Sequence, residues 1–458
     1  MPKLTVGLIV LLITAAAVAA DRPPNIVLIF ADDLGWGDVG FNGRTSWQTP
    51  NLDRLAQQGM QFNRWYTGGV VCTPSRAVLL TGKYTIHCGV TANNQSLPPE
   101  EVTIAEALKP AGYATALFGK WHLSAQQDER PVHPMDQGFD EFFGFIGGGH
   151  AWQKFPKELI DGRNRVPSQG YADTLFADRT IDFIRRKKDQ PFFAYLAVTA
   201  SHGLVEAPEE EVAKHKGKFE ETDPNEPLNA TYAAMVTRMD SDIGRIMETL
   251  EELNLIENTI VLFTSDHGAT FERMERGTTY YHDSNYPFRG QKRTLWEGGI
   301  RVPGVIHWPA RVSGGHVSHE LVHMIDVMPT LLEAAGVKTQ DAWEVDGISI
   351  LPLLTERKSL PERTLFFEWR GEGYDQVAAM RGDLKLVITG GTRPELFNVV
   401  HDQAERKTLH AIEQEMSRRL EKELRSWLET ETPHTLAARE KVLEQQRQRQ
   451  AQRGQEND

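Results

Sequence analysis

The stretch Asn25-Ile26-Val27-Leu28-Ile29-Phe30-Ala31, followed at once by Asp32-Asp33, decides how this chain folds. A continuous apolar run of this length predicts a strand that is buried on both faces of a sheet. The sequence also predicts strands at 113–118, 192–199 and 259–264, and a long amphipathic helix at 232–253 precedes the last of them. This alternation predicts an α/β fold with a mostly parallel central sheet flanked by helices.

Each predicted strand is followed by a polar motif at its carboxyl end. These motifs are Asp32-Asp33, Gly119-Lys120-Trp121-His122, Ser201-His202 and Ser265-Asp266-His267-Gly268. In open α/β sheets, ligands bind in the crevice outside the carboxyl ends of the strands. The positions of the motifs therefore predict a single active site at one edge of the sheet.

The acidic motifs indicate a cation. Two adjacent carboxylates after a buried strand, Asp32 and Asp33, are costly unless a positive charge neutralises them. Asp266 and His267 at the end of another strand would complete such a site. Oxygen donors predominate, which favours a hard cation such as calcium or magnesium. The alternative for either pair alone is a turn followed by a helix cap.

The run Cys72-Thr73-Pro74-Ser75-Arg76 opens a segment that continues to Gly82. Thr73 is expected to cap a helix and Pro74 to occupy its first turn. Residue 72 would then lie just before a helix N-terminus, where free N–H groups and the helix dipole favour an oxyanion. The alternative is a structural disulfide between Cys72 and Cys88, the only other cysteine in the sequence.

The composition and the N-terminal segment limit the possible classes of protein. The 458 residues carry a net charge of −13, which argues against a nucleic-acid partner. Residues 1–20 contain one lysine, an apolar core and a final Ala-Ala pair, which is typical of a secretory signal peptide cleaved near Ala20. We therefore expect export to the periplasm or the extracellular space, without stable membrane association.

The sequence predicts two domains. Residues 21–354 form the N-terminal α/β catalytic domain, and residues 355–432 form a C-terminal α+β subdomain. In the subdomain, short runs at 364–369, 376–380 and 384–388 predict a small antiparallel sheet, and 412–428 a closing helix. Residues 433–458 are rich in Gln, Arg and Glu, which predicts a disordered tail or a frayed helix.

These motifs, in this order, resemble the type I (formylglycine-dependent), arylsulfatase-like sulfatases of the alkaline phosphatase superfamily. The resemblance spans about residues 24 to 410, including an expected turn at 395–398. It implies that Cys72 is converted to formylglycine by a dedicated generating machinery. It also implies hydrolysis of sulfate monoesters to an alcohol and inorganic sulfate, with one Ca²⁺ per chain.

The same resemblance implies a role for each matching residue. The metal ligands would be Asp32, Asp33, Asp266, His267 and the modified Cys72. Arg76, Lys120 and Lys292 would hold sulfate, and His122 would position the nucleophile. His202 would lie near the leaving-group oxygen, which either His202 or Lys292 could protonate.

Two other functions compete with this interpretation. One is a phosphate or phosphonate ester hydrolase of the same superfamily, and the other is a catalytically inactive carbohydrate-binding protein. The proposed ligands contain only one nitrogen donor, His267, which favours calcium over a transition metal. The loops at 147–157 and 276–287 would select the substrate. The second is polar and aromatic, which favours a sulfated carbohydrate over a small aryl sulfate.

Overall fold

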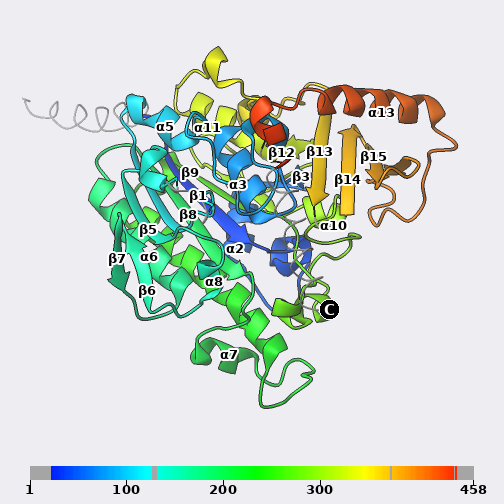
Figure 1. Cartoon of the computed structure of the whole chain (residues 1–458). Helices are drawn as coiled ribbons and strands as arrows, with labels where there is room; N and C mark the ends of the chain where they lie inside the picture. Colours follow the sequence, from blue (N-terminus) through cyan, green and yellow to red (C-terminus); the bar gives the residue numbers. More distant parts are fainter. Residues whose placement is uncertain (1–21, 126–131, 372–373, 438, 441–458) are drawn as a thin grey trace, which may run out of the picture.

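The computed structural model describes residues 22–125, 132–371, 374–437 and 439–440. The predicted signal peptide, its cleavage point at Ala20 and residues 441–458 of the predicted tail lie outside the described residues. A large sheet with helices on both faces forms the main body, and a smaller sheet covered by one helix lies beside it (Figure 1). No helix in the described ranges combines the length and the apolar character needed to cross a bilayer.

The main sheet is mostly parallel, as the sequence predicts. In spatial order its described strands are β11 (His316–Ser318), β2 (Met60–Phe62), β10 (Gly304–His307), β9 (Thr259–Ser265), β1 (Asn25–Asp32), β8 (Phe192–Ser201), β4 (Ala114–Lys120), β5 (Glu141–Phe145), β6 (Glu158–Asp161) and β7 (Asn164–Pro167). The five strands from β9 to β5 are mutually parallel, and the antiparallel pairings lie towards the two edges. A two-stranded sheet pairs β12 (Val322–His323) with β3 (Trp65–Tyr66).

Strand β1 lies in the middle of this sheet, and its side chains alternate between two hydrophobic cores. Ile26, Leu28 and Phe30 belong to one core, whereas Val27 and Ile29 belong to the other. Because successive strand residues point to opposite faces, a strand covered on both sides must be apolar at every position. This requirement explains the uninterrupted apolar run in the sequence.

Helices cover the two faces of the sheet. The described α-helices are α2 (Pro50–Gln58), α3 (Cys72–Thr81), α4 (Thr85–Cys88), α5 (Ile104–Leu108), α6 (Ala172–Lys187), α7 (Glu209–His215), α8 (Leu228–Glu252), α9 (Thr278–Tyr281), α10 (Glu297–Ile300), α11 (Val327–Ala334), α12 (Leu351–Glu356) and α13 (Gln414–Leu428). Helices α2, α6 and α8 contribute to the core that contains Val27, and α3, α5 and α11 to the core that contains Leu28.

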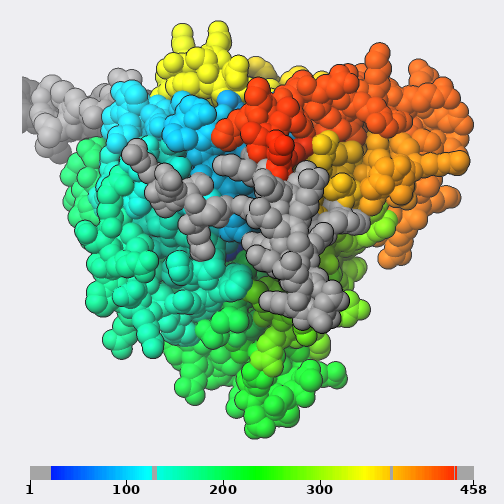
Figure 2. Space-filling view, viewed as in Figure 1, coloured from blue at the N-terminus to red at the C-terminus, as the bar shows by residue number. Residues whose placement is uncertain are grey.

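The C-terminal part contains an antiparallel sheet, as predicted, with one more strand than the sequence suggested. Its strands are β13 (Thr364–Gly371), β14 (Tyr374–Arg381), β15 (Leu384–Thr389) and β16 (Glu395–Asn398). The expectation of a turn at 395–398 is wrong, because this segment pairs with β15 along its length. The sheet and α13 form a lobe at one side of the molecule (Figure 2).

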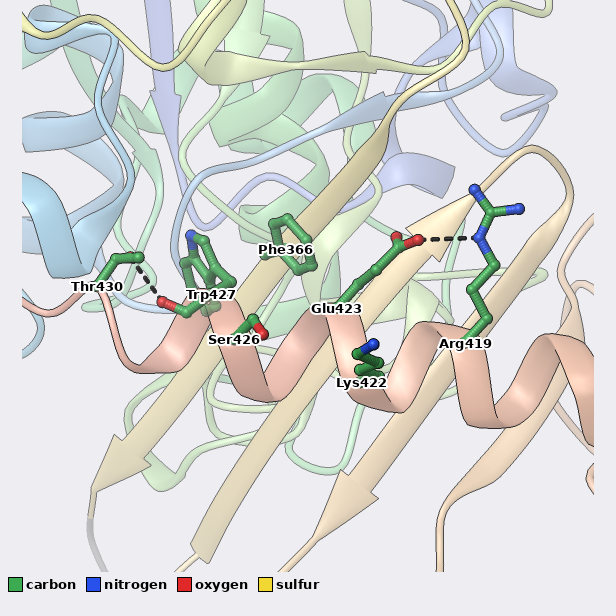
Figure 3. A pocket seen from close by; sticks show the side chains of 7 residues that line it. All are labelled: Phe366, Arg419, Lys422, Glu423, Ser426, Trp427 and Thr430. Atoms are coloured by element: carbon green, nitrogen blue, oxygen red, sulfur yellow. Dashed lines mark hydrogen bonds and ion pairs between the residues drawn. The ribbon is translucent and has the colours of Figure 1, made fainter.

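Helix α13 packs on the C-terminal sheet through aromatic side chains. The rings of Phe366 and Trp427 stack with centroids 5.1 Å apart (Figure 3). They line a surface hollow of about 550 Å³ that contains none of the predicted site residues. Beyond α13 the chain returns to the main body, where Thr435 is buried and its hydroxyl donates to the Ile86 carbonyl at 2.6 Å.

The start of α5 gives a stability prediction. The Thr103 hydroxyl accepts the Glu106 N–H at 3.2 Å, and the Glu106 carboxylate accepts the Thr103 N–H at 2.9 Å. The predicted capping box is therefore present. Thr103→Ala is expected to lower the free energy of unfolding by about 1–2 kcal/mol, because the Glu106 N–H and the buried Gln137 carbonyl both lose the Thr103 hydroxyl as their hydrogen-bond partner.

Urea denaturation followed by circular dichroism would measure this loss. Thr355→Ala is the control, since the Thr355 hydroxyl donates to the Leu351 carbonyl of its own helix and caps nothing. Its effect is expected to stay within about 0.5 kcal/mol. Equal losses in the two variants would contradict the role of the capping box.

Candidate active site

The site lies at the carboxyl ends of four parallel strands. Strand β1 ends at Asp32, β4 at Lys120, β8 at Ser201 and β9 at Ser265. Because these strands are parallel neighbours, the motifs that follow them meet at one edge of the sheet. The structure thus brings together residues that are far apart in the sequence.

Residue 72 opens helix α3, and its position differs from the expected one. Val71, not Thr73, is the N-cap residue, so Cys72 is the first residue inside the helix. The Thr73 N–H donates to the Asn93 side chain at 3.1 Å instead. The expected cap at Thr73 is therefore wrong, but Cys72 remains in the first turn. Both cysteines are buried free thiols, which excludes a disulfide between Cys72 and Cys88 in this structure.

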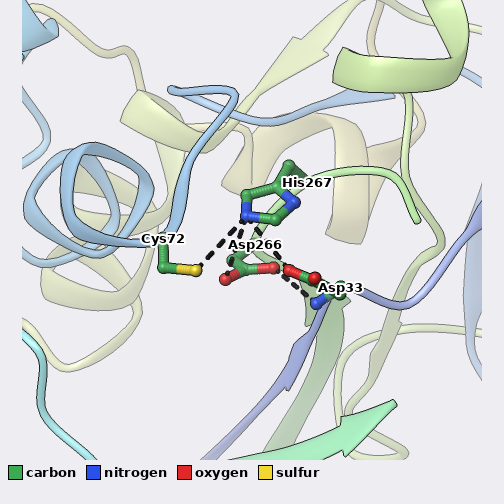
Figure 4. Close-up of side chains that lie close together, drawn as sticks. All are labelled: Asp33, Cys72, Asp266 and His267. Atoms are coloured by element: carbon green, nitrogen blue, oxygen red, sulfur yellow. Dashed lines mark hydrogen bonds and ion pairs between the residues drawn. The ribbon is translucent and has the colours of Figure 1, made fainter. Parts of the chain in front are cut away.

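Four buried side chains converge beside α3. Ligand atoms of Asp33, Cys72, Asp266 and His267 all lie within 4.8 Å of one another (Figure 4). His267 Nε2 is 3.4 Å from Asp33 Oδ1, 3.5 Å from Asp266 Oδ2 and 3.5 Å from Cys72 Sγ. Three electron-rich groups around one nitrogen make an arrangement that a cation would stabilise.

The second ring nitrogen of His267 sets its tautomer. Nδ1 lies 3.1 Å from the Gly268 carbonyl oxygen, so we assign the proton to Nδ1. The lone pair of Nε2 then faces the carboxylates and Cys72, as in histidines that bind metals. Two buried carboxylate oxygens, Asp32 Oδ1 and Asp266 Oδ2, accept no hydrogen bond and have the Arg76 guanidinium as an ion-pair partner. The donor set and these two oxygens fit a hard divalent cation.

Asp32 does not join this group of four. It lies instead in a neighbouring group with Cys72 and His202, whose ligand atoms are also within 4.8 Å of one another. Its Oδ2 accepts a hydrogen bond from Lys120 Nζ at 2.6 Å. Arg76 Nη2 lies 3.4 Å from Asp32 Oδ1 and 3.7 Å from Asp266 Oδ2. Arg76 therefore bridges two of the site carboxylates.

The three predicted sulfate-binding cations are buried around residue 72. Lys292 Nζ lies 2.9 Å from both oxygens of Asp33, and Arg76 Nη1 donates to the Lys120 carbonyl at 2.9 Å. Burial favours the neutral thiol of Cys72, yet the charges of Lys120 and Lys292 hold its pKa well below the ordinary value. The position of residue 72 is therefore one that stabilises a negative charge.

His122 is held as a neutral base. Burial and the nearby charge of Lys120 lower the pKa of its imidazole to about 4. Its Nδ1 is buried without a hydrogen-bond partner. The ring packs against the backbone of Gly148, where an added Cβ would lie 2.2 Å from His122 Nε2. Only glycine allows this close approach.

His202 lies close to Asp33, as Lys292 does, and it has neighbours that the sequence did not reveal. Its Nε2 is 3.7 Å from Asp33 Oδ2, and its ring stacks on Trp152 with centroids 6.3 Å apart. The buried carboxylate of Glu275 forms a third group with Asp33 and His202, within 4.8 Å. Burial and the Asp33 charge raise the pKa of Glu275. Glu275 lies in no motif, so only the structure places it here.

The mostly parallel sheet with this site at its carboxyl edge defines an alkaline phosphatase-like hydrolase. The family model described as sulfatase matches residues 24–337, and the model of the N-sulphoglucosamine sulphohydrolase C-terminal region matches residues 288–432. The chain belongs to the type I sulfatases of this superfamily and is a sulfuric ester hydrolase.

Individual relatives agree with the family models. The chain is 34% identical over 394 residues to N-acetylgalactosamine-6-sulfatase of Homo sapiens, covering 78% of this chain and 70% of the relative. It is 34% identical to human arylsulfatase A, with 78% and 73% coverage. The structure of Ps i-CgsB in complex with k-i-k-neocarrahexaose superimposes with a TM-score of 0.81 at 29% identity, covering 89% of this chain and 93% of the other.

Proposed function

We propose that this sulfatase releases sulfate from a sulfated carbohydrate through a formylglycine nucleophile derived from Cys72. The observation that carries the proposal is the position of residue 72 in the first turn of α3. There it faces His267 at 3.5 Å, and Lys120 and Lys292 favour a negative charge on it. When present, the hydrated aldehyde supplies the hydroxyl that attacks the sulfur.

Asp33, Asp266 and His267 would hold one calcium ion, together with Asp32 and the modified residue 72. The preference for calcium rests on the carboxylate oxygens, which outnumber the single nitrogen donor. The bound ion would neutralise the buried carboxylates and help to balance the charge of the sulfate group. Asp32 lies outside the group of four, with its Oδ2 paired to Lys120, so its carboxylate would have to move to bind the ion.

The cationic side chains bind and orient the sulfate. Arg76, Lys120 and Lys292 are buried, and their charges are fixed before the substrate arrives. Preorganised charges of this kind stabilise the negative charge that develops in the transition state. In this role, each of them would exchange part of its contact with a site carboxylate for a contact with a sulfate oxygen.

The two histidines handle protons on opposite sides of the reaction. His122 is neutral and interacts with the side chain of residue 72, so its imidazole can accept a proton from that side chain as sulfate departs. His202 stacks beside the exposed ring of Trp152 and would donate a proton to the leaving-group oxygen. In this proposal, His202 acts when the alcohol leaves, and His122 acts when sulfate is released.

Aromatic side chains and similar proteins support a carbohydrate substrate. Trp152, Tyr280 and Tyr281 are 41%, 75% and 44% exposed on the two loops predicted to select the substrate. Exposed aromatic rings of this kind can stack on sugar rings. One relative is an N-acetylgalactosamine-6-sulfatase, and one similar structure holds a neocarrahexaose. Export through the N-terminal signal, and modification by formylglycine-generating machinery, complete the proposal.

Peptide mass analysis tests the nucleophile. Protein from a host with the oxidising machinery is expected to carry an aldehyde oxygen in place of sulfur at residue 72, and to release sulfate from a panel of sulfated saccharides. Protein from a host without the machinery should keep Cys72 and be nearly inactive, because a thiol adduct has no easy route to sulfate release. High activity in fully unmodified protein would contradict the mechanism, and faster hydrolysis of phosphate esters would contradict the substrate class.

A further inference from the structure

The segment that carries His202 is held by buried charged side chains that do not belong to the sulfate site. At the end of β8, Asp173 Oδ1 accepts the Thr199 N–H at 2.7 Å, and Asp173 Oδ2 accepts the Ala200 N–H at 2.9 Å. From the other side, Lys154 Nζ donates to the Thr199 carbonyl at 2.6 Å. Asp173 belongs to α6, whereas Lys154 belongs to the 147–157 loop.

The Thr199 side chain connects the two charges. Its hydroxyl lies 3.0 Å from Lys154 Nζ and 2.9 Å from Asp173 Oδ1. Lys154 and Asp173 are both completely buried. A buried lysine is costly unless it is compensated, and here the carboxylate and the carbonyl oxygen compensate it through Thr199. Movement of the backbone at Thr199 and Ala200 would leave these buried charges unpaired, so the backbone immediately before Ser201 and His202 is fixed.

Further contacts fix the backbone after Thr199 and the His202 ring. Glu275, at the end of the short helix η7 (Arg273–Glu275), accepts the Gly203 N–H at 3.2 Å. His202 Nδ1 lies 2.9 Å from the Gly203 carbonyl oxygen. Trp152, two residues before Lys154, stacks on the His202 ring at an interplanar angle of 17°. The same loop therefore holds both the backbone and the ring.

We propose that Lys154 and Asp173 are positioning residues that hold His202 in line with the leaving-group oxygen of the substrate. This inference rests on the proposed function, in which His202 gives a proton to that oxygen as the sulfur–oxygen bond breaks. Nε2 of the protonated His202 ring gives up its proton, the bonding electron pair goes to the oxygen, and a neutral alcohol and a neutral imidazole result. A misplaced ring would leave a strongly basic alkoxide without its proton.

If Lys154 positions His202, the rate that is lost when Lys154 is replaced should depend on how much the leaving group needs a proton. A sugar alkoxide needs the proton, whereas 4-nitrophenolate is stable without it. In the full-length, formylglycine-bearing enzyme, Lys154→Met is expected to lower kcat for a sulfated saccharide by about 100-fold, with KM nearly unchanged. For 4-nitrophenyl sulfate, kcat should fall by no more than about threefold.

Two further variants make the test decisive. Thr199→Val removes only the hydroxyl that connects Lys154 and Asp173, and is expected to have the same selective effect at about fivefold if Lys154→Met does not fold. Lys83→Met is the matched control, because Lys83 is also buried and paired, with Glu101, beyond the opposite end of α3. It should cost stability without any dependence on the leaving group.

A double-mutant cycle shows whether the effect passes through His202. In a His202→Ala background, Lys154→Met should cause no further loss with the saccharide. Equal losses with both substrates, or losses that multiply in that background, would overturn the inference. A wild-type enzyme that carries formylglycine but hydrolyses neither sulfate ester would instead contradict the proposed function.

Discussion

Cys72→Ala is expected to abolish sulfate release, with a fall in turnover on the order of 10⁴-fold or more. In the proposed mechanism, the variant removes the side chain from which the attacking hydroxyl is made. The fold should persist, because the change deletes one small buried side chain from the first turn of α3. Steady-state kinetics with a sulfated saccharide, together with thermal denaturation, measure both effects.

Cys88→Ala provides the control for this experiment. Burial raises the pKa of the Cys88 thiol to about 12, in contrast to the lowered pKa of Cys72. Cys88 Sγ lies 3.7 Å from the Thr85 carbonyl oxygen, and Cys88 is in none of the groups that converge at the site. Cys88→Ala should therefore keep nearly full activity. Equal inactivation by the two substitutions would indicate a structural role for both cysteines.

Asp266→Ala is expected to lose calcium and turnover together, with kcat/KM reduced by about 10³-fold or more. Asp266 Oδ1 accepts the Asp33 N–H at 2.9 Å, and Oδ2 faces His267 Nε2 at 3.5 Å. The substitution thus removes one ligand and releases the backbone of a second. Elemental analysis of the purified protein should find about one calcium per wild-type chain and almost none in the variant.

His267→Asn is the matched substitution at the adjacent ligand. Asparagine also presents one neutral donor atom, so the variant should keep calcium and lose less than about tenfold in kcat/KM. Retention of the metal by Asp266→Ala would remove Asp266 from the ligand set. Loss of the metal from His267→Asn, with Asp266 intact, would show that the imidazole ring itself is required.

Much of the site was predictable because each motif follows a strand that the sequence identifies. The apolar run before Asp32 predicts β1, and the strands before Lys120, His202 and Asp266 are recognisable in the same way. Once a parallel sheet is predicted, its geometry brings those ends together without further information. The antiparallel C-terminal sheet was predicted from short runs, but its fourth strand was not.

The sequence by itself determined the four central strands of the main sheet and the polar motifs at their carboxyl ends, because hydrophobic pattern and motif position are local properties. Only the tertiary structure decided which ligand atoms converge. It separated Asp32 from the group of Asp33, Asp266 and His267, and placed Cys72 inside α3. It also brought Lys154, Asp173 and Glu275 to the His202 segment. Such contacts join residues far apart in the chain and depend on loop conformation and buried charge pairing, which no local pattern encodes.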